Sequence, residues 1–220
     1  MRFSAEDTEC QFCDGVLDGF GDHALVCCGG GCRTCRHNLI RNMAFHAAEA
    51  ANLQPELERP GLLPERPLVG SSYENGSRHN GAALDTGSRR PADVYIPRWR
   101  SGPPAAWDFA VTSGLRVGLQ SDAVVSSDTV TRRYEDFKSS HKDTRAECEA
   151  QGFAFTPMVV EAVGGCWGEA ARSVWTELAK KSVLAMGELE TKRSCAAMLM
   201  QRLSLTLHRE NARACLRRFG

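Results

Sequence analysis

The pattern of apolar and polar positions predicts helices toward both ends of the chain. Between Arg36 and Asn52 apolar residues recur every three or four positions, which is typical of an amphipathic helix, and Pro55 ends it. The charged stretch 129–151 is also helical in pattern, with a glycine next in sequence as its cap. Two further helices are predicted at about 169–186 and 190–218.

Short apolar runs in the middle of the chain predict strands. Ala92–Ile96 and Ala106–Val111 are separated by a linker rich in proline and glycine, which favours a hairpin. The run 153–163 reads as a buried strand, 56–63 as an extended segment between prolines, and 70–88 as a flexible surface loop rich in Gly, Ser and Asn. The order of elements predicts an α/β or α+β fold with a mixed central sheet flanked by helices.

Composition and charge narrow the class of protein. The chain has 220 residues, 42% of them hydrophobic and 25% charged, as in one soluble domain with or without a small appendage. Its net charge is zero, so contact with nucleic acid must come from local patches. The apolar runs fall far short of the ~20 residues that a membrane span needs. Acidic residues near the start argue against a signal peptide, so we expect an intracellular protein, nuclear in a eukaryote.

Cysteines gather near the start of the chain. Six of the ten lie between Cys10 and Cys35, and cysteine pairs with two residues between them, in a reducing compartment, indicate a metal site. Two ligand sets remain open. One is a four-thiolate set of Cys10, Cys13, Cys32 and Cys35. The other is the set Cys10, Cys13, His23 and Cys27, in which Cys28 could replace Cys27. Either would hold a structural Zn²⁺ with no open position for catalysis.

Two aspartates stand inside the predicted hairpin. A carboxylate in an apolar strand costs several kcal/mol unless something compensates it, and a hairpin can bring Asp93 and Asp108 to one ion. Mg²⁺ or Mn²⁺ suits such a pair, because Mg²⁺ takes one or two carboxylates plus water and substrate phosphate. The alternative is an ordinary ion pair for each, Asp93 with Arg89 or Arg90.

Further candidates lie on the next helix and strand. Tyr134 and Lys138 share a helical face with His141 or Lys142, and a lysine there can stabilise charge on a phosphoryl group. Glu161 interrupts an otherwise apolar strand just before a glycine turn. It is expected either to complete the site or to serve as a structural hydrogen-bond acceptor.

These motifs resemble a known family. Arg90-Pro-Ala-Asp93, Asp108-Phe-Ala-Val111 and Tyr134-Glu-Asp-Phe-Lys138 resemble the PD-(D/E)XK superfamily, and more narrowly the restriction-like endonuclease domain of site-specific non-LTR retrotransposon proteins. The resemblance implies Mg²⁺-dependent DNA cleavage, with Asp93 and Asp108 as metal ligands and Lys138 as the catalytic lysine. It also favours the Cys-Cys-His-Cys ligand set. Ala110 occupies the position where the family usually has its lysine, and Ala92 separates the proline from Asp93.

Basic residues follow the cysteine-rich head. Arg36 and His37 are expected at a helix N-terminus, which favours an anion such as a DNA phosphate. The expected DNA contacts are Arg33, Arg36, His37, Arg41, Arg90 and Tyr134. We expect a zinc knuckle at 1–35, a nuclease core at 36–186 and a basic helix packed on the core at 187–220, with no small-molecule organic cofactor. The alternative function is an inactive zinc-dependent nucleic-acid-binding module or a fragment of a retrotransposon polyprotein.

Overall fold

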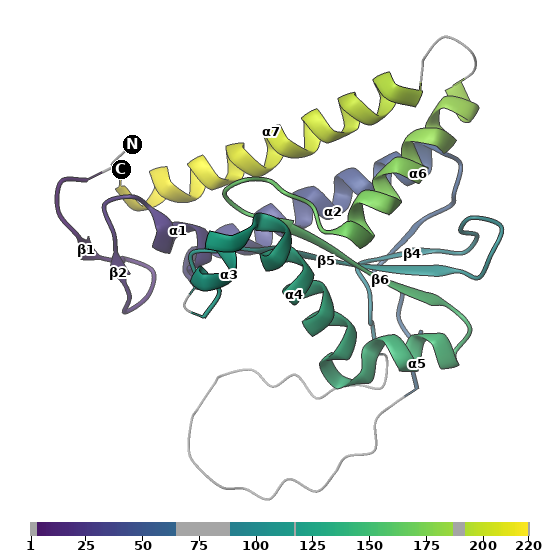
Figure 1. Ribbon diagram of the computed structural model, residues 1–220, viewed down its shortest axis with the longest axis horizontal. Coiled ribbons are helices and arrows are strands. Elements are labelled where there is room, and N and C mark those ends of the chain that lie inside the picture. Colours follow the sequence, from purple (N-terminus) through teal and green to yellow (C-terminus); the bar gives the residue numbers. More distant parts are fainter. Residues whose placement is uncertain (1–3, 65–88, 117, 187–191, 220) are drawn as a thin grey trace, which may run out of the picture.

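The computed structural model describes residues 4–64, 89–116, 118–186 and 192–219. It has one mixed four-stranded sheet with helices on both faces and a small N-terminal head (Figure 1). The predicted flexible loop at 70–88 lies outside the described residues. No helix in the described part of the chain is long and apolar enough to cross a membrane.

The sheet has the strand order β3-β4-β5-β6. β4 (Val94–Ile96) and β5 (Ala105–Thr112) form the predicted antiparallel hairpin, and β6 (Ala154–Glu161) runs parallel to β5. The predicted extended segment 56–63 contributes only β3 (Glu56–Leu57), which pairs antiparallel with β4. Pro157, which has no N–H to donate, is tolerated because β6 is an edge strand.

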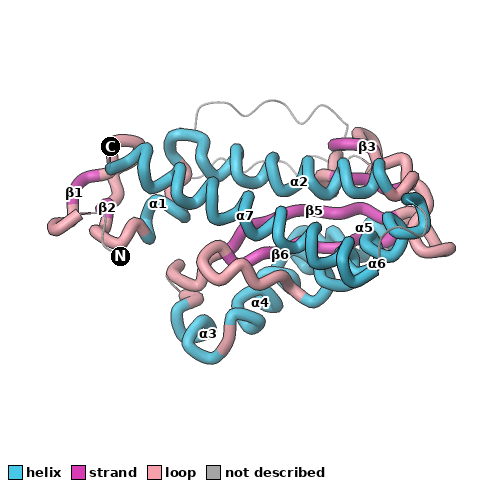
Figure 2. The backbone as a smooth tube through the Cα atoms, turned by 90° about the horizontal axis from the view of Figure 1, so that it is seen from above, coloured by secondary structure: helices cyan, strands magenta, loops and turns pink. Residues whose placement is uncertain are grey.

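Helices cover both faces of the sheet, as two perpendicular views show (Figures 1 and 2). α2 (Cys32–Ala50), α6 (Glu169–Met186) and α7 (Lys192–Phe219) lie on one face, and α4 (Ser127–Ser140) and α5 (Thr144–Ala150) lie on the other. A short helix that the sequence did not predict, α3 (Gln120–Val125), packs against α4.

The single helix predicted at 129–151 is wrong. α4 ends at Ser140, and a 3₁₀ turn at His141–Asp143 separates it from α5. Lys142 and Asp143 have φ of 53° and 54°, in the left-handed region, so the chain changes direction there. The face of α4 that carries Tyr134 and Lys138 therefore ends before Lys142.

Side chains alternate along β5, and this alternation positions the site. Trp107 and Phe109 point into the core under α2, α6 and α7, whereas Ala106 packs on the α5 side with Phe155. Asp108 therefore faces α4. The core contains large apolar side chains that are almost completely buried, each worth about 1.5–3 kcal/mol. They are Ile40, Val94, Ile96, Trp107, Met158, Val160, Leu178, Leu203 and Leu207.

The head consists of the hairpin β1 (Thr8–Glu9) and β2 (Val16–Leu17), the helix α1 (Asp22–Val26) and a 3₁₀ turn at Gly29–Gly31. The last turns of α7 pack on it, because Cys215 and Phe219 join its small apolar cluster. α7 thus packs on α2 and α6 along its length and on the head at its end.

Candidate metal centre and active-site cleft

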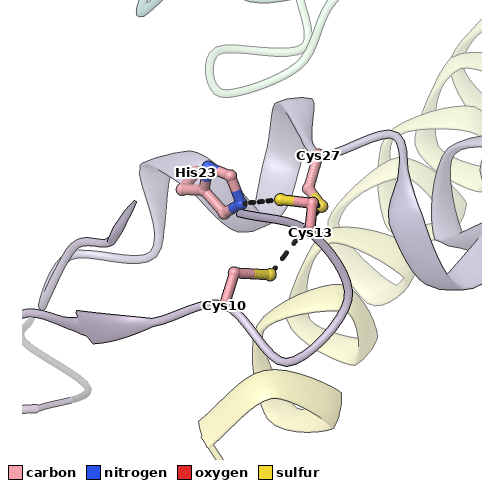
Figure 3. A group of neighbouring side chains, drawn as sticks. All are labelled: Cys10, Cys13, His23 and Cys27. Carbon is pink, nitrogen blue, oxygen red and sulfur yellow. Dashed lines mark hydrogen bonds between the residues drawn. The ribbon is translucent and has the colours of Figure 1, made fainter. Parts of the chain in front are cut away.

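Four side chains of the head form a candidate zinc centre (Figure 3). One ligand atom from each of Cys10, Cys13, His23 and Cys27 lies within 4.8 Å of all the others. The Sγ atom of Cys27 is 3.6 Å from that of Cys13 and 3.9 Å from that of Cys10. Tetrahedral Zn–S bonds of about 2.3 Å separate two sulfurs by about 3.8 Å, so the ligand atoms fit a zinc ion.

Local chemistry holds these ligands in place. Position 15 has no room for a side chain, because a Cβ on Gly15 would lie 2.5 Å from Cε1 of His23. The Asp18 carboxylate accepts the His23 amide at 2.7 Å and so fixes the start of α1. Burial opposes ionisation of Cys10, but hydrogen bonds from the Phe12 amide and the His23 side chain outweigh it and lower the pKa of Cys10 to about 6. A thiolate is the form that binds zinc.

The other proposed ligands lie elsewhere. Cys32 opens α2, and its Sγ accepts from Arg217 at 3.4 Å and from Arg218 at 3.6 Å. Cys35 is exposed on α2. Cys28 is also exposed, and Arg33 donates to its Sγ at 2.9 Å. The four-thiolate set and the replacement of Cys27 by Cys28 are therefore both wrong for this structure.

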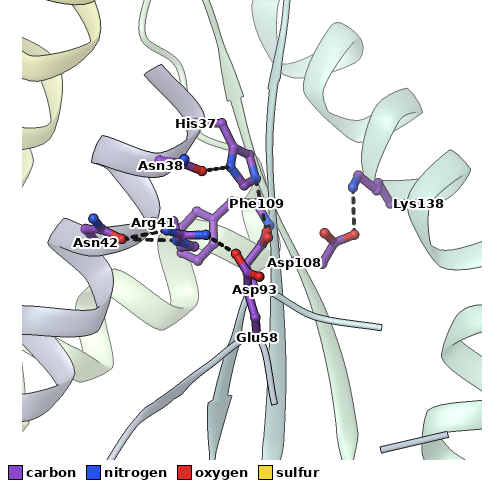
Figure 4. Close-up of polar contacts among 9 residues, drawn as sticks. All are labelled: His37, Asn38, Arg41, Asn42, Glu58, Asp93, Asp108, Phe109 and Lys138. Carbon is purple, nitrogen blue, oxygen red and sulfur yellow. Dashed lines mark hydrogen bonds and ion pairs between the residues drawn. The ribbon is translucent and has the colours of Figure 1, made fainter. Parts of the chain in front are cut away.

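The two predicted Mg²⁺ ligands both lie at the hairpin, with Asp93 on the α2 side of β5 and Asp108 on the α4 side (Figure 4). The sequence predicted Asp93 inside the strand, but β4 begins one residue later, at Val94. Its Oδ2 accepts the Phe109 amide at 2.6 Å, and that amide belongs to the peptide that follows Asp108. Both aspartate side chains keep less than a fifth of their surface exposed.

Each carboxylate has a basic partner on a helix. His37 Nε2 on α2 lies 3.2 Å from Asp93 Oδ2, and Lys138 Nζ on α4 donates to Asp108 Oδ2 at 2.7 Å. Burial raises the pKa of Asp108 to about 6 although Lys138 opposes this, and the negative charge of Asp93 adds to the rise. The hydrogen bond to Asp93 raises the pKa of His37. Among the described residues, neither Oδ1 atom accepts a hydrogen bond.

A cleft of about 470 Å³ opens beside Asp108 and Lys138, and Asp93 is not among the residues that line it. Its walls come from the start of α2, from β5 and from α4, three segments far apart in sequence. The cleft brings together six of the residues predicted to act in catalysis or DNA binding: Arg33, Arg36, His37, Asp108, Tyr134 and Lys138. Ala110 lines the cleft, and the lysine that contacts Asp108 there comes from α4.

Three of the predicted DNA contacts have partners within the chain. Arg36 is 4% exposed and donates to Asn211 Oδ1 on α7 and to the Leu25 carbonyl. Burial lowers its pKa to about 10, which still leaves it charged at neutral pH. Arg41 and Arg90 both pair with Glu58, outside the cleft. Arg33 is exposed at the start of α2 and lines the cleft, as does the half-buried His37.

Glu161 was expected either to complete the site or to act as a structural acceptor. The side chain is buried, and its carboxylate accepts the backbone amides of Gly114, Val163 and Gly164. It is not among the residues that line the cleft. This geometry fits the structural alternative, in which Glu161 holds the loops that follow β5 and β6.

Two features of the site were not predicted from the sequence. Thr34 lines the cleft, and its spacing of three from His37 on a helix was the available signal. The contact between His37 and Asp93 joins residues 56 apart, and no local pattern indicates it. No protein-family model matches the chain, and no curated protein is significantly similar to it. The functional assignment therefore rests on the cleft itself.

Proposed function

We propose that this chain is a metal-dependent DNA endonuclease domain of the restriction-like type, built on a zinc-stabilised head. The observation that carries the proposal is the 2.7 Å contact between Lys138 Nζ and Asp108 Oδ2 inside a cleft that also holds Arg33 and His37. An acid, a lysine and exposed cations around one cleft are the groups that phosphodiester hydrolysis needs.

The carboxylates suit Mg²⁺ or Mn²⁺. Asp93 and Asp108 lie at neighbouring positions of the hairpin, and each has an Oδ1 without a hydrogen bond among the described residues. A hard divalent cation takes such oxygens and keeps other positions for water and phosphate. When bound, the ion would polarise the scissile phosphate and lower the pKa of the attacking water.

The residues of the chain have separate roles in this proposal. Lys138 orients the Asp108 carboxylate and stabilises negative charge on the phosphoryl group. Arg33, exposed at the start of α2, binds a neighbouring phosphate. His37 orients Asp93 through its 3.2 Å contact. Hydrolysis adds one water across one P–O bond and leaves a phosphate monoester and a hydroxyl.

The alternative is a nucleic-acid-binding module without nuclease activity. One observation favours it, since Lys138 and His37 already provide a basic partner for both carboxylates without a metal ion. Such a module would bind DNA through Arg33 and keep the aspartates as internal ion pairs.

Nicking of supercoiled plasmid by the zinc-loaded chain tests the proposal. We expect cleavage with Mg²⁺ or Mn²⁺, and a loss of about 10²–10³-fold in rate in Asp108→Asn and in Lys138→Ala. Matched controls are Asp136→Asn, exposed on the same helix, and Lys180→Ala, whose partner is Glu177. Both should cleave like the parent chain.

The outcomes separate the two functions. Full cleavage by purified Asp108→Asn would refute the nuclease assignment and point to a contaminating enzyme. DNA binding by the parent chain with no cleavage under either ion would select the binding module.

A further inference from the structure

Three aromatic rings line up on the outer side of α4 and the turn that follows it. The ring centroids of Tyr134 and Phe137 are 5.6 Å apart, and those of Phe137 and His141 are 5.1 Å apart. The planes of these pairs are tilted by 51° and 35°. Phe137 is 51% exposed, and its ring is not part of the core clusters of the described residues.

This aromatic row adjoins the active-site cleft. Tyr134 lines both the cleft and a second hollow of about 400 Å³, which is also bounded by Arg116, Arg133 and Phe137. A third hollow of about 390 Å³ shares Arg33 with the cleft and Arg116 with the second hollow. The three hollows therefore adjoin one another, and we call the second and third together the aromatic groove.

The groove carries positive charge suited to a polyanion. Arg116 is exposed, and no described residue accepts a hydrogen bond from its side chain or pairs with it. Arg33 is exposed, and within the described part of the chain its one side-chain hydrogen bond goes to Cys28 Sγ. Arg133 pairs with Asp122 and donates to the Gly118 carbonyl, so it is held in place. No aspartate or glutamate of the described residues lines either hollow of the groove.

We propose that the aromatic groove binds a single-stranded segment of nucleic acid next to the scissile phosphate. Unpaired bases stack on Phe137 and Tyr134, and backbone phosphates contact Arg116 and Arg33. Only an unpaired base can offer its face to Phe137, because bases inside a duplex are covered by their neighbours. The inference rests on the proposed function and narrows its substrate to DNA with an unpaired segment, such as a flap or an opened site.

Binding is measured by fluorescence anisotropy with the zinc-loaded full chain and no Mg²⁺, so that cleavage plays no part. The probes are a single-stranded oligonucleotide, the same sequence as a duplex, and that duplex with a single-stranded flap. We expect the single strand and the flap to bind at least 10-fold more tightly than the duplex. Phe137→Leu, which removes the ring and keeps an apolar helix-forming side chain, should weaken binding of both by about 5- to 150-fold.

A spectroscopic signature distinguishes stacking from a merely structural role. A 2-aminopurine base in the oligonucleotide should be quenched by the parent chain and less so by Phe137→Leu. The matched control is Phe20→Leu, because Phe20 is 55% exposed but lines neither hollow of the groove. This control should bind and quench like the parent chain.

The outcomes separate this inference from the nuclease assignment. Preference for single strands with quenching, but without cleavage when Mg²⁺ is added, supports the groove and overturns the nuclease. Equal affinity for duplex and single strand, or an unchanged affinity in Phe137→Leu, overturns the groove even if plasmid nicking succeeds.

Discussion

Replacing Lys138 by methionine should destabilise the protein through the charge that it leaves on Asp108. Methionine keeps the length of the side chain but removes the cation 2.7 Å from Asp108 Oδ2. The carboxylate is then mostly buried and has lost its nearest counter-charge. Removal of one partner from a buried pair costs about 3–5 kcal/mol. Because 23% and 19% of the two side chains remain exposed, we expect about 2–3 kcal/mol at pH 7.5.

This cost should depend on pH with a definite sign. Burial raises the pKa of Asp108 to about 6, above the ordinary value of about 3.9 for an aspartate. The contribution of this group to stability is therefore fully present below about pH 4 and is lost as the pH rises through 6. Lys138→Met raises the pKa of Asp108 further, so above pH 6 the variant loses more stability than the parent chain. At pH 5 Asp108 is mostly neutral in both proteins, and the difference should shrink to less than about 1 kcal/mol.

Urea unfolding of four proteins isolates the pair: the parent chain, Lys138→Met, Asp108→Asn and the double variant. The buried Trp107 and Trp175 provide the fluorescence signal, and the buffer contains zinc but no Mg²⁺. We expect Lys138→Met to cost less than about 1 kcal/mol when residue 108 is already asparagine, which gives a coupling of about 2 kcal/mol at pH 7.5. A loss that is equal at pH 5 and pH 7.5, or a coupling near zero, would show that Asp108 and Lys138 are not a charge pair.

Two further predictions concern the head and the loops. Cys13→Ala should lower the zinc content of the purified chain from one ion toward none and reduce its melting temperature. Cys35→Ala, at an exposed cysteine outside the ligand set, should keep the full zinc content. Mass spectrometry under native conditions measures the zinc content, and retained zinc in Cys13→Ala would contradict the ligand set. Glu161→Ala leaves three backbone amides without their acceptor and should lower the free energy of unfolding by about 3 kcal/mol in chemical denaturation. Plasmid nicking well below the melting temperature of the variant should continue. Complete loss of nicking in a folded variant would make Glu161 part of the reaction.

Local patterns predicted much of the fold. The hairpin followed from two apolar runs around a proline-rich linker, and α6 runs over the predicted residues 169–186. The break at His141–Asp143 could not be foreseen, because its left-handed residues are Lys142 and Asp143 and no glycine or proline marks the turn. Tertiary contacts of α4 and α5 with the sheet override the helical pattern there.

The candidate site was predictable only where the signal was local. Spacing singled out Cys10 and Cys13 but fitted two ligand sets equally well, and only the folded head distinguishes them. Arg36 and Arg41 look like phosphate ligands in sequence because nothing local reveals their partners Asn211 and Glu58. The sign of a charge can be read from the sequence, whereas its partner depends on packing between distant segments.

The contacts between the end of α7 and the head have a consequence for the order of folding. Arg217 and Arg218 donate to the carbonyls of Gly30 and Gly29, and these contacts join residues nearly 190 positions apart. During synthesis the head emerges first, but it can dock only after α7 has been made, because Cys215 and Phe219 of α7 complete its apolar cluster. The wall of the cleft at Arg33, just beyond this contact, is therefore among the last parts to assemble, and a nascent chain would carry its head long before the cleft could form.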